Sequence, residues 1–437
     1  MFQLEVIIVG GGWAGCAAAF AAIKGGAKVT LIEKTNMLLG TGLVGGIMRN
    51  NGRFTAFEEI WALGGGDFLR LIEGTARHRF LNFPGHNHAT LYDTTQIEPV
   101  IRTYLQEIGV NIHLETRITG VNRQGNSLYS IQATGGQEFK GDMFVDTTGS
   151  AGPVCNCTMY GGGCAMCILR CPAYGPRVSL TAKAGVKEIM AGEGFPQFEA
   201  MSGSCILEKT SLTSNLVNQL ETNGMLIIPL PKTILKENLL GTKACQQYNL
   251  SEYAANLIIL DTGHAKIMTP YFPLESLRTL PGFARARYAD PYSGGKGNSV
   301  RFMAMAPCGV DLKVDGVDNL YCAGEKTGLL VGHTEAISTG MLAGINAVRH
   351  LAGKKAVILP DQLAVGDIIA YMHKEMLTPE GLEQKYTFSG SVYFQRMKQK
   401  NLYTTNVEDI QKRVKRSGLK GVFCSKQIKT SLPLKRN

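Results

Sequence analysis

The sequence lacks the features of secretion, of internal repetition and of a membrane span. It does not begin with a basic segment and a cleavage site, but with a strand-like run over residues 2–9. It contains no repeats and no low-complexity stretches. The uncharged run over 6–23 approaches the length of a membrane helix, but four glycines interrupt it. We therefore expect a globular protein of the cytoplasm without a membrane span.

Net charge is also lacking over most of the chain. The formal net charge is +10, and the segment 395–437, which we call the basic tail, holds twelve Lys and Arg against two acidic residues. The tail thus carries the whole surplus, and the rest of the chain is balanced. A length of 437 residues with 44% hydrophobic content is enough for about two or three domains with their own cores.

Glycines are abundant, and those near the N-terminus form a nucleotide-binding pattern. Within residues 4–33 the chain reads as a strand, a glycine turn, a helix, a second strand and an acid. The glycines of the turn are Gly10, Gly12 and Gly15, and the acid is Glu33. Such a turn presents free N–H groups to a pyrophosphate, while the acid accepts hydroxyls of an adenine ribose. The pattern predicts an adenine dinucleotide site, and the carboxylate disfavours a 2′-phosphate.

Two later segments resemble the two-segment FAD-binding flavoproteins. The first, 141–153, is a strand that ends in Thr-Thr-Gly, and the second, 316–353, is a strand that ends in Ala-Gly-Glu before a glycine loop and a long helix. The resemblance implies that Thr148 and Gly149 lie near the nucleotide. It also implies that Glu325 approaches the phosphate and ribityl region of the flavin. The further cofactor-binding residues that it implies are Gly324, and the backbone at Gly332, His333 and Thr334 beside the pyrimidine ring.

Within this superfamily two groups are most similar. The stretch "YDTTQIEPVIRTYLQEIGVNIHLETRITGV" with the later "FVDTTG" resembles FAD-dependent oxidoreductases that include the heterodisulfide reductase A subunit. The stretch "LYCAGEKTGLLVGHTEAISTGMLAGINA" resembles the glucose-inhibited division protein A family and its relatives, the folate- and FAD-dependent tRNA uracil methyltransferases. The resemblance covers residues 1–155 and 300–355 and concerns FAD binding more than substrate.

These patterns predict an α/β fold with a Rossmann-like FAD-binding domain built from two chain segments, 1–154 and 301–355. Between them we expect an inserted α+β substrate domain over 155–300. A mostly helical, basic extension should follow over 356–437. We expect the basic tail, 395–437, to be separable from the cofactor domain, and the protein to be a candidate homo-oligomer.

A second dinucleotide domain is not indicated. The glycine triplets 64–66 and 161–163 lack a preceding strand and an acid at the right distance. Electrons would therefore come from NAD(P)H that docks transiently at the flavin, or from a protein donor.

Five cysteines crowd the stretch 155–172, directly after the Thr-Gly strand. They are Cys155, Cys157, Cys164, Cys167 and Cys171. The C-x2-C-x3-C-P spacing suits ligands of a [4Fe–4S] cluster, with zinc as a second option. A redox dithiol and purely structural cysteines stay open as alternatives. We take all five as candidate metal ligands, and Cys164, Cys167 and His333 as candidate catalytic residues.

Three further features are weaker. The loop 40–46 is expected to line the cofactor. The loop 284–301 carries Arg285, Arg287, Lys296 and Arg301, and would either hold an anionic substrate or lie solvated at the surface. His86 and His88 would share one face of an extended strand, which alone is weak support for a metal site.

The basic tail contains a predicted helix within 407–423. Lys412, Lys415 and Arg416 share one face of it, with Arg413 beside them. Such a face suits RNA phosphates, but it is equally typical of a solvated terminal helix.

Three functional hypotheses follow. The first is an FAD-dependent oxidoreductase that exchanges hydride or electrons with a small-molecule or protein redox substrate held between cofactor domain and insert. The second is a flavoenzyme that modifies uridine in tRNA or rRNA, bound through the tail. The third is an FAD-containing subunit of an electron-transfer complex.

Overall fold

The computed structural model describes residues 4–150, 178–191, 205–235, 250–268, 273–289 and 303–428. Its centre is a parallel sheet in the order β17-β10-β1-β2-β6. The strands are β1 (Glu5–Val9), β2 (Lys28–Ile32), β6 (Asn111–His113), β10 (Met143–Asp146) and β17 (Leu320–Cys322). Apart from the first residues of β1 and β2, the residues of β1, β2, β10 and β17 are buried, as expected for apolar strands of a parallel sheet covered on both faces, whereas the edge strand β6 is partly exposed. Because β17 pairs with β10 in register Phe144↔Leu320, two distant chain segments build one sheet, as predicted.

Two helices that run in the same direction hold these segments together. They are α1 (Trp13–Gly25) and α12 (His333–Leu351). A Cβ placed on Gly340 would lie 2.3 Å from the Ala14 carbonyl oxygen, and one on Gly344 would lie 2.3 Å from that of Ala18. Only glycine fits at these two positions, and the backbones of the helices therefore touch.

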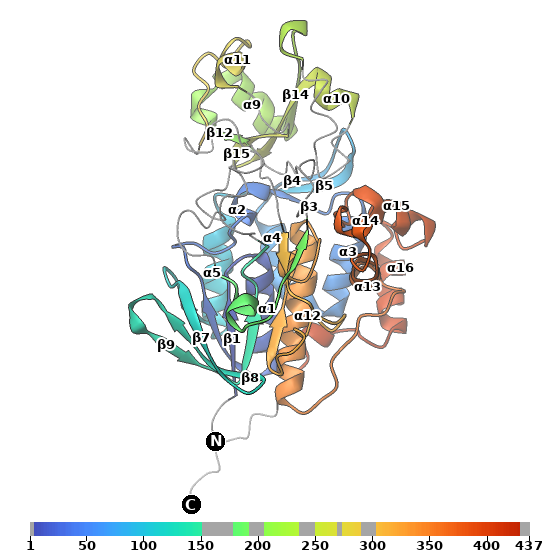
Figure 1. The fold of residues 1–437 in the computed structure, drawn as a ribbon. Helices are drawn as coiled ribbons and strands as arrows, with labels where there is room; N and C mark the ends of the chain where they lie inside the picture. Colours follow the sequence, from blue (N-terminus) through green and yellow to red (C-terminus); the bar gives the residue numbers. More distant parts are fainter. Residues whose placement is uncertain are drawn as a thin grey trace, which may run out of the picture.

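Smaller elements surround this core (Figure 1). An antiparallel meander joins β7 (Ile118–Gln124), β8 (Ser127–Ala133) and β9 (Glu138–Lys140). A second three-stranded sheet has the order β3 (Ile47–Met48), β5 (His86–Tyr92), β4 (Ala76–Phe83). The helices that accompany them are α2 (Gly42–Gly45), α3 (Gly52–Ile60), α4 (Gly66–Gly74), α5 (Ile97–Glu107) and α8 (Leu180–Lys183), with a π-helical turn η1 (Trp61–Gly65) between α3 and α4.

The inserted α+β unit lies at the top of Figure 1 and has its own apolar core. Its antiparallel sheet has the order β12 (Cys205–Leu207), β15 (His264–Ile267), β14 (Asn256–Thr262), β13 (Met225–Pro229). Its helices are α9 (Ser214–Asn223), α10 (Ser251–Ala255) and α11 (Leu274–Arg278). A short ladder of β11 (Ile189–Ala191) with β16 (Met303–Met305) connects the start of the insert with the return of the chain. Among the described residues, no helix combines the length and apolarity needed to cross a bilayer.

The region after α12 is mostly helical, as predicted, but it is not a separate appendage. It contains α13 (Ala364–Glu375), α14 (Pro379–Leu382), α15 (Ser391–Gln399) and α16 (Val407–Arg416). Side chains from it enter the same core as α1 and α12, among them Met397, Leu402, Val414 and Phe423. The expectation of a separable tail is therefore wrong for the described part, because its helices bury apolar faces against the cofactor domain.

A buried ion pair adds to this attachment. The Glu59 carboxylate of α3 is fully buried and lies 3.0 Å from the Arg413 guanidinium of α16. It also accepts the backbone N–H groups of Ala364 and Val365, each at 3.0 Å. Burial raises the pKa of Glu59 to about 7, although Arg413 and the two N–H groups lower it. Arg413 thus serves the fold, whereas the sequence suggested a position beside an RNA-binding face.

We predict that Arg413→Met lowers the free energy of unfolding by about 3 kcal/mol at pH 8, because it leaves a buried carboxylate without its partner. A carboxyl with a raised folded-state pKa stabilises the fold at low pH, and that contribution is lost as pH rises through the folded pKa. Since Arg413 lowers the pKa of Glu59, the loss of unfolding free energy in Arg413→Met should be smaller at pH 5, where Glu59 can hold a proton. Urea unfolding at both pH values measures this, with the exposed Lys412→Met as control. Equal losses of unfolding free energy in Arg413→Met and Lys412→Met would contradict a stabilising role of the Glu59–Arg413 ion pair.

Candidate active site

The glycine turn between β1 and α1 has the form that a pyrophosphate site needs. Gly10 has φ +107°, and a Cβ there would lie 2.4 Å from the Thr147 carbonyl oxygen. A Cβ on Gly15 would lie 1.8 Å from the Gly10 carbonyl oxygen. Gly12, the N-cap of α1, differs, because a Cβ there would meet nothing within 4 Å. The turn is therefore closed on its inner side and open at Gly12, where the helix presents unpaired N–H groups to an anion.

Glu33 lies directly beside this turn and is only 8% exposed. Its Oε2 accepts the Gly11 N–H at 2.7 Å, and its Oε1 accepts the N–H and hydroxyl of Thr35 at 2.9 and 3.1 Å. A carboxylate can accept about four hydrogen bonds, so capacity remains for a ribose hydroxyl. The position and the fixed orientation of this carboxylate fit the adenine-ribose role.

The Thr-Thr-Gly end of β10 lies against the same turn. The Thr147 hydroxyl lies 2.8 Å from the Val9 carbonyl oxygen and 2.6 Å from that of Gly10. The Thr148 hydroxyl donates instead to Asp146 Oδ1 at 2.7 Å, and a Cβ on Gly149 would face open space. Thr147 is thus the threonine that contacts the glycine turn. The sequence could not separate it from its neighbour, because two adjacent threonines at a strand end differ only in direction.

The Ala-Gly-Glu end of β17 completes the edge of the sheet. Gly324 packs on Ala14 at the start of α1, and its N–H donates to Thr339 Oγ1 of α12 at 2.9 Å. Glu325 Oε2 accepts the Ser150 hydroxyl at 2.8 Å, which links the second segment to the Thr-Gly loop. The structure therefore brings the three predicted motifs together at the carboxyl ends of β1, β10 and β17, where ligands bind in open parallel sheets.

The N-terminus of α12 carries His333, whose ring orientation is fixed by a buried tyrosine. The Tyr92 hydroxyl donates to the Gly42 carbonyl oxygen at 2.5 Å and lies 3.2 Å from His333 Nδ1. Burial raises the pKa of Tyr92, so this phenol keeps its only proton. Since that proton goes to Gly42, the proton of the second contact must reside on His333 Nδ1. Gly45 of the predicted loop 40–46 packs directly on the imidazole. Tyr92 is the first residue of the stretch "YDTTQIEPV" noted in the sequence, but nothing in that stretch assigned it a contact with His333.

A second buried carboxylate fixes this helix end. Glu335 is 1% exposed and accepts Arg53 Nε of α3 at 3.1 Å. It also accepts the Thr387 hydroxyl at 2.7 Å and the Phe388 N–H at 2.8 Å. Arg53 reaches the Val331 carbonyl oxygen at 3.3 Å. The loop before α12 is therefore held by α3 and by the C-terminal region together, through residues that sequence patterns do not connect.

Several predicted site residues lie outside the described part of the chain. These are Cys155, Cys157, Cys164, Cys167, Cys171, Lys296 and Arg301. Within the described ranges no group of three metal-binding side chains occurs. There, His86 hydrogen-bonds Asn50 at 2.7 Å, and the His88 ring contacts Phe54. The cysteine site therefore stays a prediction.

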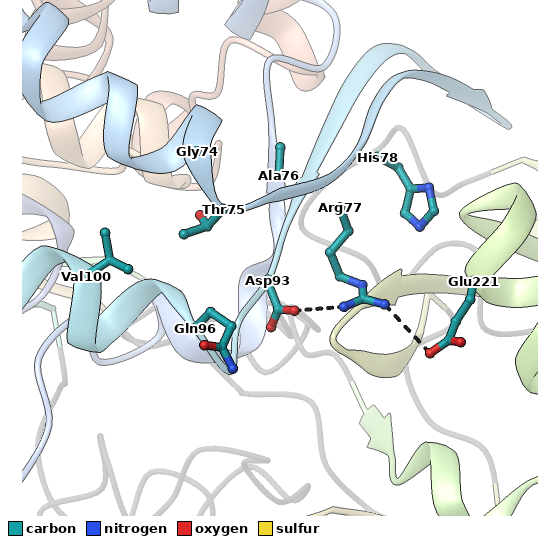
Figure 2. Close-up of a pocket in the computed structure, with 9 residues that line it drawn as sticks. All are labelled: Gly74, Thr75, Ala76, Arg77, His78, Asp93, Gln96, Val100 and Glu221. Carbon is teal, nitrogen blue, oxygen red and sulfur yellow. Dashed lines mark hydrogen bonds and ion pairs between the residues drawn. The ribbon is translucent and has the colours of Figure 1, made fainter.

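The one hollow we describe lies apart from this site, where the insert meets the β3-β5-β4 sheet (Figure 2). It measures about 560 Å³, and Arg77 points across it toward Asp93 and Glu221. Arg77 lies 2.9 Å from Asp93, 3.7 Å from Glu221 and 2.9 Å from the fully buried Asp261. Burial raises the pKa of Asp261, but hydrogen bonds from Lys209, His78 and Arg77 hold it below its usual range. This charge network fastens the insert to the cofactor domain.

Two known families match the two chain segments that build the site. Residues 5–154 match the family of FAD dependent oxidoreductases, and residues 263–355 match the family of glucose inhibited division protein A. The chain is thus similar to FAD dependent oxidoreductases in its first segment and to glucose inhibited division protein A in its second, each over part of its length.

One curated relative is the tRNA uridine 5-carboxymethylaminomethyl modification enzyme MnmG of Chlorobium phaeovibrioides. It is 24% identical over 408 residues, which cover 79% of this chain and 63% of the relative. The methylenetetrahydrofolate–tRNA-(uracil-5-)-methyltransferase TrmFO of Caldicellulosiruptor bescii is 43% identical over 54 residues, or 12% of each chain. Among solved structures, GidA of Aquifex aeolicus superposes with a TM-score of 0.65 at 18% identity, over 96% of this chain and 74% of GidA. The chain thus spans less than two thirds of the first of these relatives.

We predict that Glu33→Ala purifies with much less flavin than the unchanged protein. Loss of a hydrogen bond from a ligand hydroxyl to a carboxylate costs about 1.5–3 kcal/mol, which is roughly tenfold or more in affinity. Flavin per protein, measured by absorbance after denaturation, tests this, with the exposed Glu107→Ala as matched control. Glu33→Gln, which keeps the shape of the side chain, guards against a folding defect. Full flavin content in both Glu33 variants would remove Glu33 from the site.

Proposed function

We propose that this protein is an FAD-dependent enzyme that modifies uridine in tRNA. The observation that carries the proposal is the convergence of the open glycine turn, Glu33 and Glu325 at one edge of the sheet, in a fold that follows GidA along nearly the whole chain. The names of the curated relatives, which act on tRNA uridines, supply the substrate class. A cytoplasmic location fits this role.

The residues at the site divide the work of holding the cofactor. The Gly12 amide and the N-terminus of α1 would hold the pyrophosphate, and Glu33 the adenine ribose. Glu325 would meet the ribityl and phosphate region. When bound, FAD supplies hydride and single-electron transfer, which none of the protein side chains provides.

The start of α12 would act on the flavin ring. Its N-terminal dipole favours negative charge beside Gly332 and Thr334. The Tyr92 contact orients the His333 imidazole, and so places a group that can donate or accept a proton at the same helix end. We take His333 as the candidate proton donor or acceptor for the substrate.

The described part of the basic tail offers a surface for RNA. Lys412, Lys415 and Arg416 are exposed on α16, and Lys420 and Lys426 are exposed after it. Asn406 caps the start of α16, where Glu408 and Asp409 lie, and the cations gather at its end, so this distribution of charge also suits the dipole of the helix itself. Arg413 is excluded from this surface because it pairs with Glu59.

We predict that the double variant Lys415→Glu, Arg416→Glu binds unmodified tRNA roughly tenfold more weakly, with a dependence on salt that is shallower by about two phosphate contacts. Lys140→Glu, on β9 at the opposite side of Figure 1, is the matched control. Filter binding over a salt series measures both, and nucleoside analysis of tRNA from cells without the protein tests the modification itself. Absence of tRNA binding at low salt would defeat the substrate assignment while leaving the flavin content unaffected.

A second candidate function is electron transfer to a cysteine site. The described chain reaches Ser150, whose hydroxyl contacts Glu325, and the stretch 155–171 follows in the sequence outside the described residues. The C-x2-C-x3-C-P spacing so soon after Ser150 in the sequence supports the [4Fe–4S] hypothesis, with zinc or a redox dithiol as the alternatives.

We predict that anaerobically purified protein contains iron and sulfide, and that Cys164→Ser, Cys167→Ser and Cys171→Ser each lose both together. A zinc site would show zinc alone, and a redox dithiol would show no metal and two essential cysteines. Metal and sulfide analysis distinguishes these outcomes. Protein without iron or zinc, or a fully active Cys171→Ser variant, would contradict a metal site.

A further inference from the structure

A cysteine and a histidine from distant segments meet beneath the loop that carries Glu325. Cys308, which follows β16, is partly exposed, and its Sγ lies 3.9 Å from His373 Nε2 of α13. The same sulfur lies 3.7 Å from the Thr327 carbonyl oxygen. Cys322 at the end of β17 is a second thiol close to it and is fully buried. Because the described residues contain no three-residue metal group, this cluster is suited to thiol chemistry rather than to metal binding.

The surroundings of Cys308 favour its deprotonated form. The pKa of Cys308 is lowered to about 6, mainly by the hydrogen bond with the Cys322 thiol. Burial raises this pKa, and the hydrogen bond and charge of His373 lower it further. The charge of Asp315 raises it. The thiol of Cys322 keeps its proton, since burial and the Cys308 charge raise its pKa well above the usual value. The Nε2 atom of His373 is placed to accept the Cys308 proton.

The other thiols of the described chain are placed differently. Cys16 lies fully buried within α1, and burial raises its pKa. Cys424 is exposed on η9 (Val422–Cys424), where its Sγ contacts the Gly421 carbonyl oxygen at 3.3 Å. Cys308 alone among the free thiols described here combines access with a histidine partner.

We propose that Cys308 is a modification site for low-molecular-weight disulfides. The Cys308 thiolate attacks one sulfur of the disulfide, and a new S–S bond forms as the old one breaks. The second half of the reagent leaves as a thiolate and takes up a proton. No further oxidant is needed, because the disulfide itself is reduced as Cys308 is oxidised.

The position of Cys308 connects this chemistry with the cofactor loop. Thr327, whose carbonyl contacts the sulfur, donates its own hydroxyl to the Gly324 carbonyl oxygen at 2.9 Å. The Ala306 N–H donates to the Lys326 carbonyl oxygen at 2.8 Å, close to Cys308 in the chain. A group attached to Cys308 would press on this loop and displace Glu325. Modification should therefore weaken flavin retention, a consequence that rests on the proposed cofactor site.

The test uses the full chain and oxidised glutathione between pH 5.5 and 8.5, with the modification of each cysteine-containing peptide followed by mass spectrometry. At pH 6.5 we expect Cys308, which has a histidine partner, to react roughly fivefold faster than Cys424, whose sulfur contacts a carbonyl oxygen. The Cys308 rate should level off above about pH 7. His373→Gln should shift the Cys308 profile to higher pH and leave Cys424 unchanged, with the exposed Lys374→Gln as control.

Two outcomes would overturn the proposal: an unmodified Cys308 peptide, or a pH profile for Cys308 that follows that of Cys424 and ignores His373→Gln. Flavin release is measured in the same samples, and Cys308→Ser should abolish the release. Full flavin retention by modified protein would overturn the connection to the loop. Because the peptide data need no bound flavin, failure of the proposed function is distinguishable from failure of this site.

Discussion

The contact between α1 and α12 is the constraint on which the rest of the structure depends. Gly340 and Gly344 let one helix backbone approach the carbonyl oxygens of Ala14 and Ala18 on the other. Since α1 follows β1 and α12 follows β17, this contact fixes two distant chain segments as one domain. It also sets Gly324 against Ala14, so that the Glu325 loop and the glycine turn face the same edge of the sheet. A larger side chain at either glycine would separate the two halves of the proposed cofactor site.

Buried carboxylates extend this arrangement to the C-terminal region. Glu335 connects the start of α12 with α3 and with Thr387, while Glu59 connects α3 with α13 and α16. A buried carboxylate is costly without partners, so each one strongly specifies the groups that must surround it. The region after α12 therefore helps to position the site and at the same time exposes its cations. This combination explains how a basic segment can belong to the cofactor domain and still offer a surface for RNA.

The insert is attached by charge and by apolar packing together. Arg77 and the fully buried Asp261 meet at a hollow that is lined mainly by charged and polar side chains. Leu91 of β5 also shares a buried apolar core with Ile258 and Leu260 of the insert strand β14, and the insert has a further core of its own. The ion pairs therefore add orientation to a junction that apolar contacts already hold.

The sequence by itself determined the nucleotide-binding turn, Glu33, the two-segment sheet and the helical character of the C-terminal region. These features depend on local backbone geometry and short-range periodicity, which leave a pattern in neighbouring residues. Only the tertiary structure decided that Thr147 contacts the turn, that Tyr92 orients His333, and that Arg413 is buried against Glu59. Such contacts join residues that lie far apart in the chain, 282 positions for Arg53 and Glu335, and no local period records them. They arise because burial forces each polar group to find a partner wherever the fold brings one within reach.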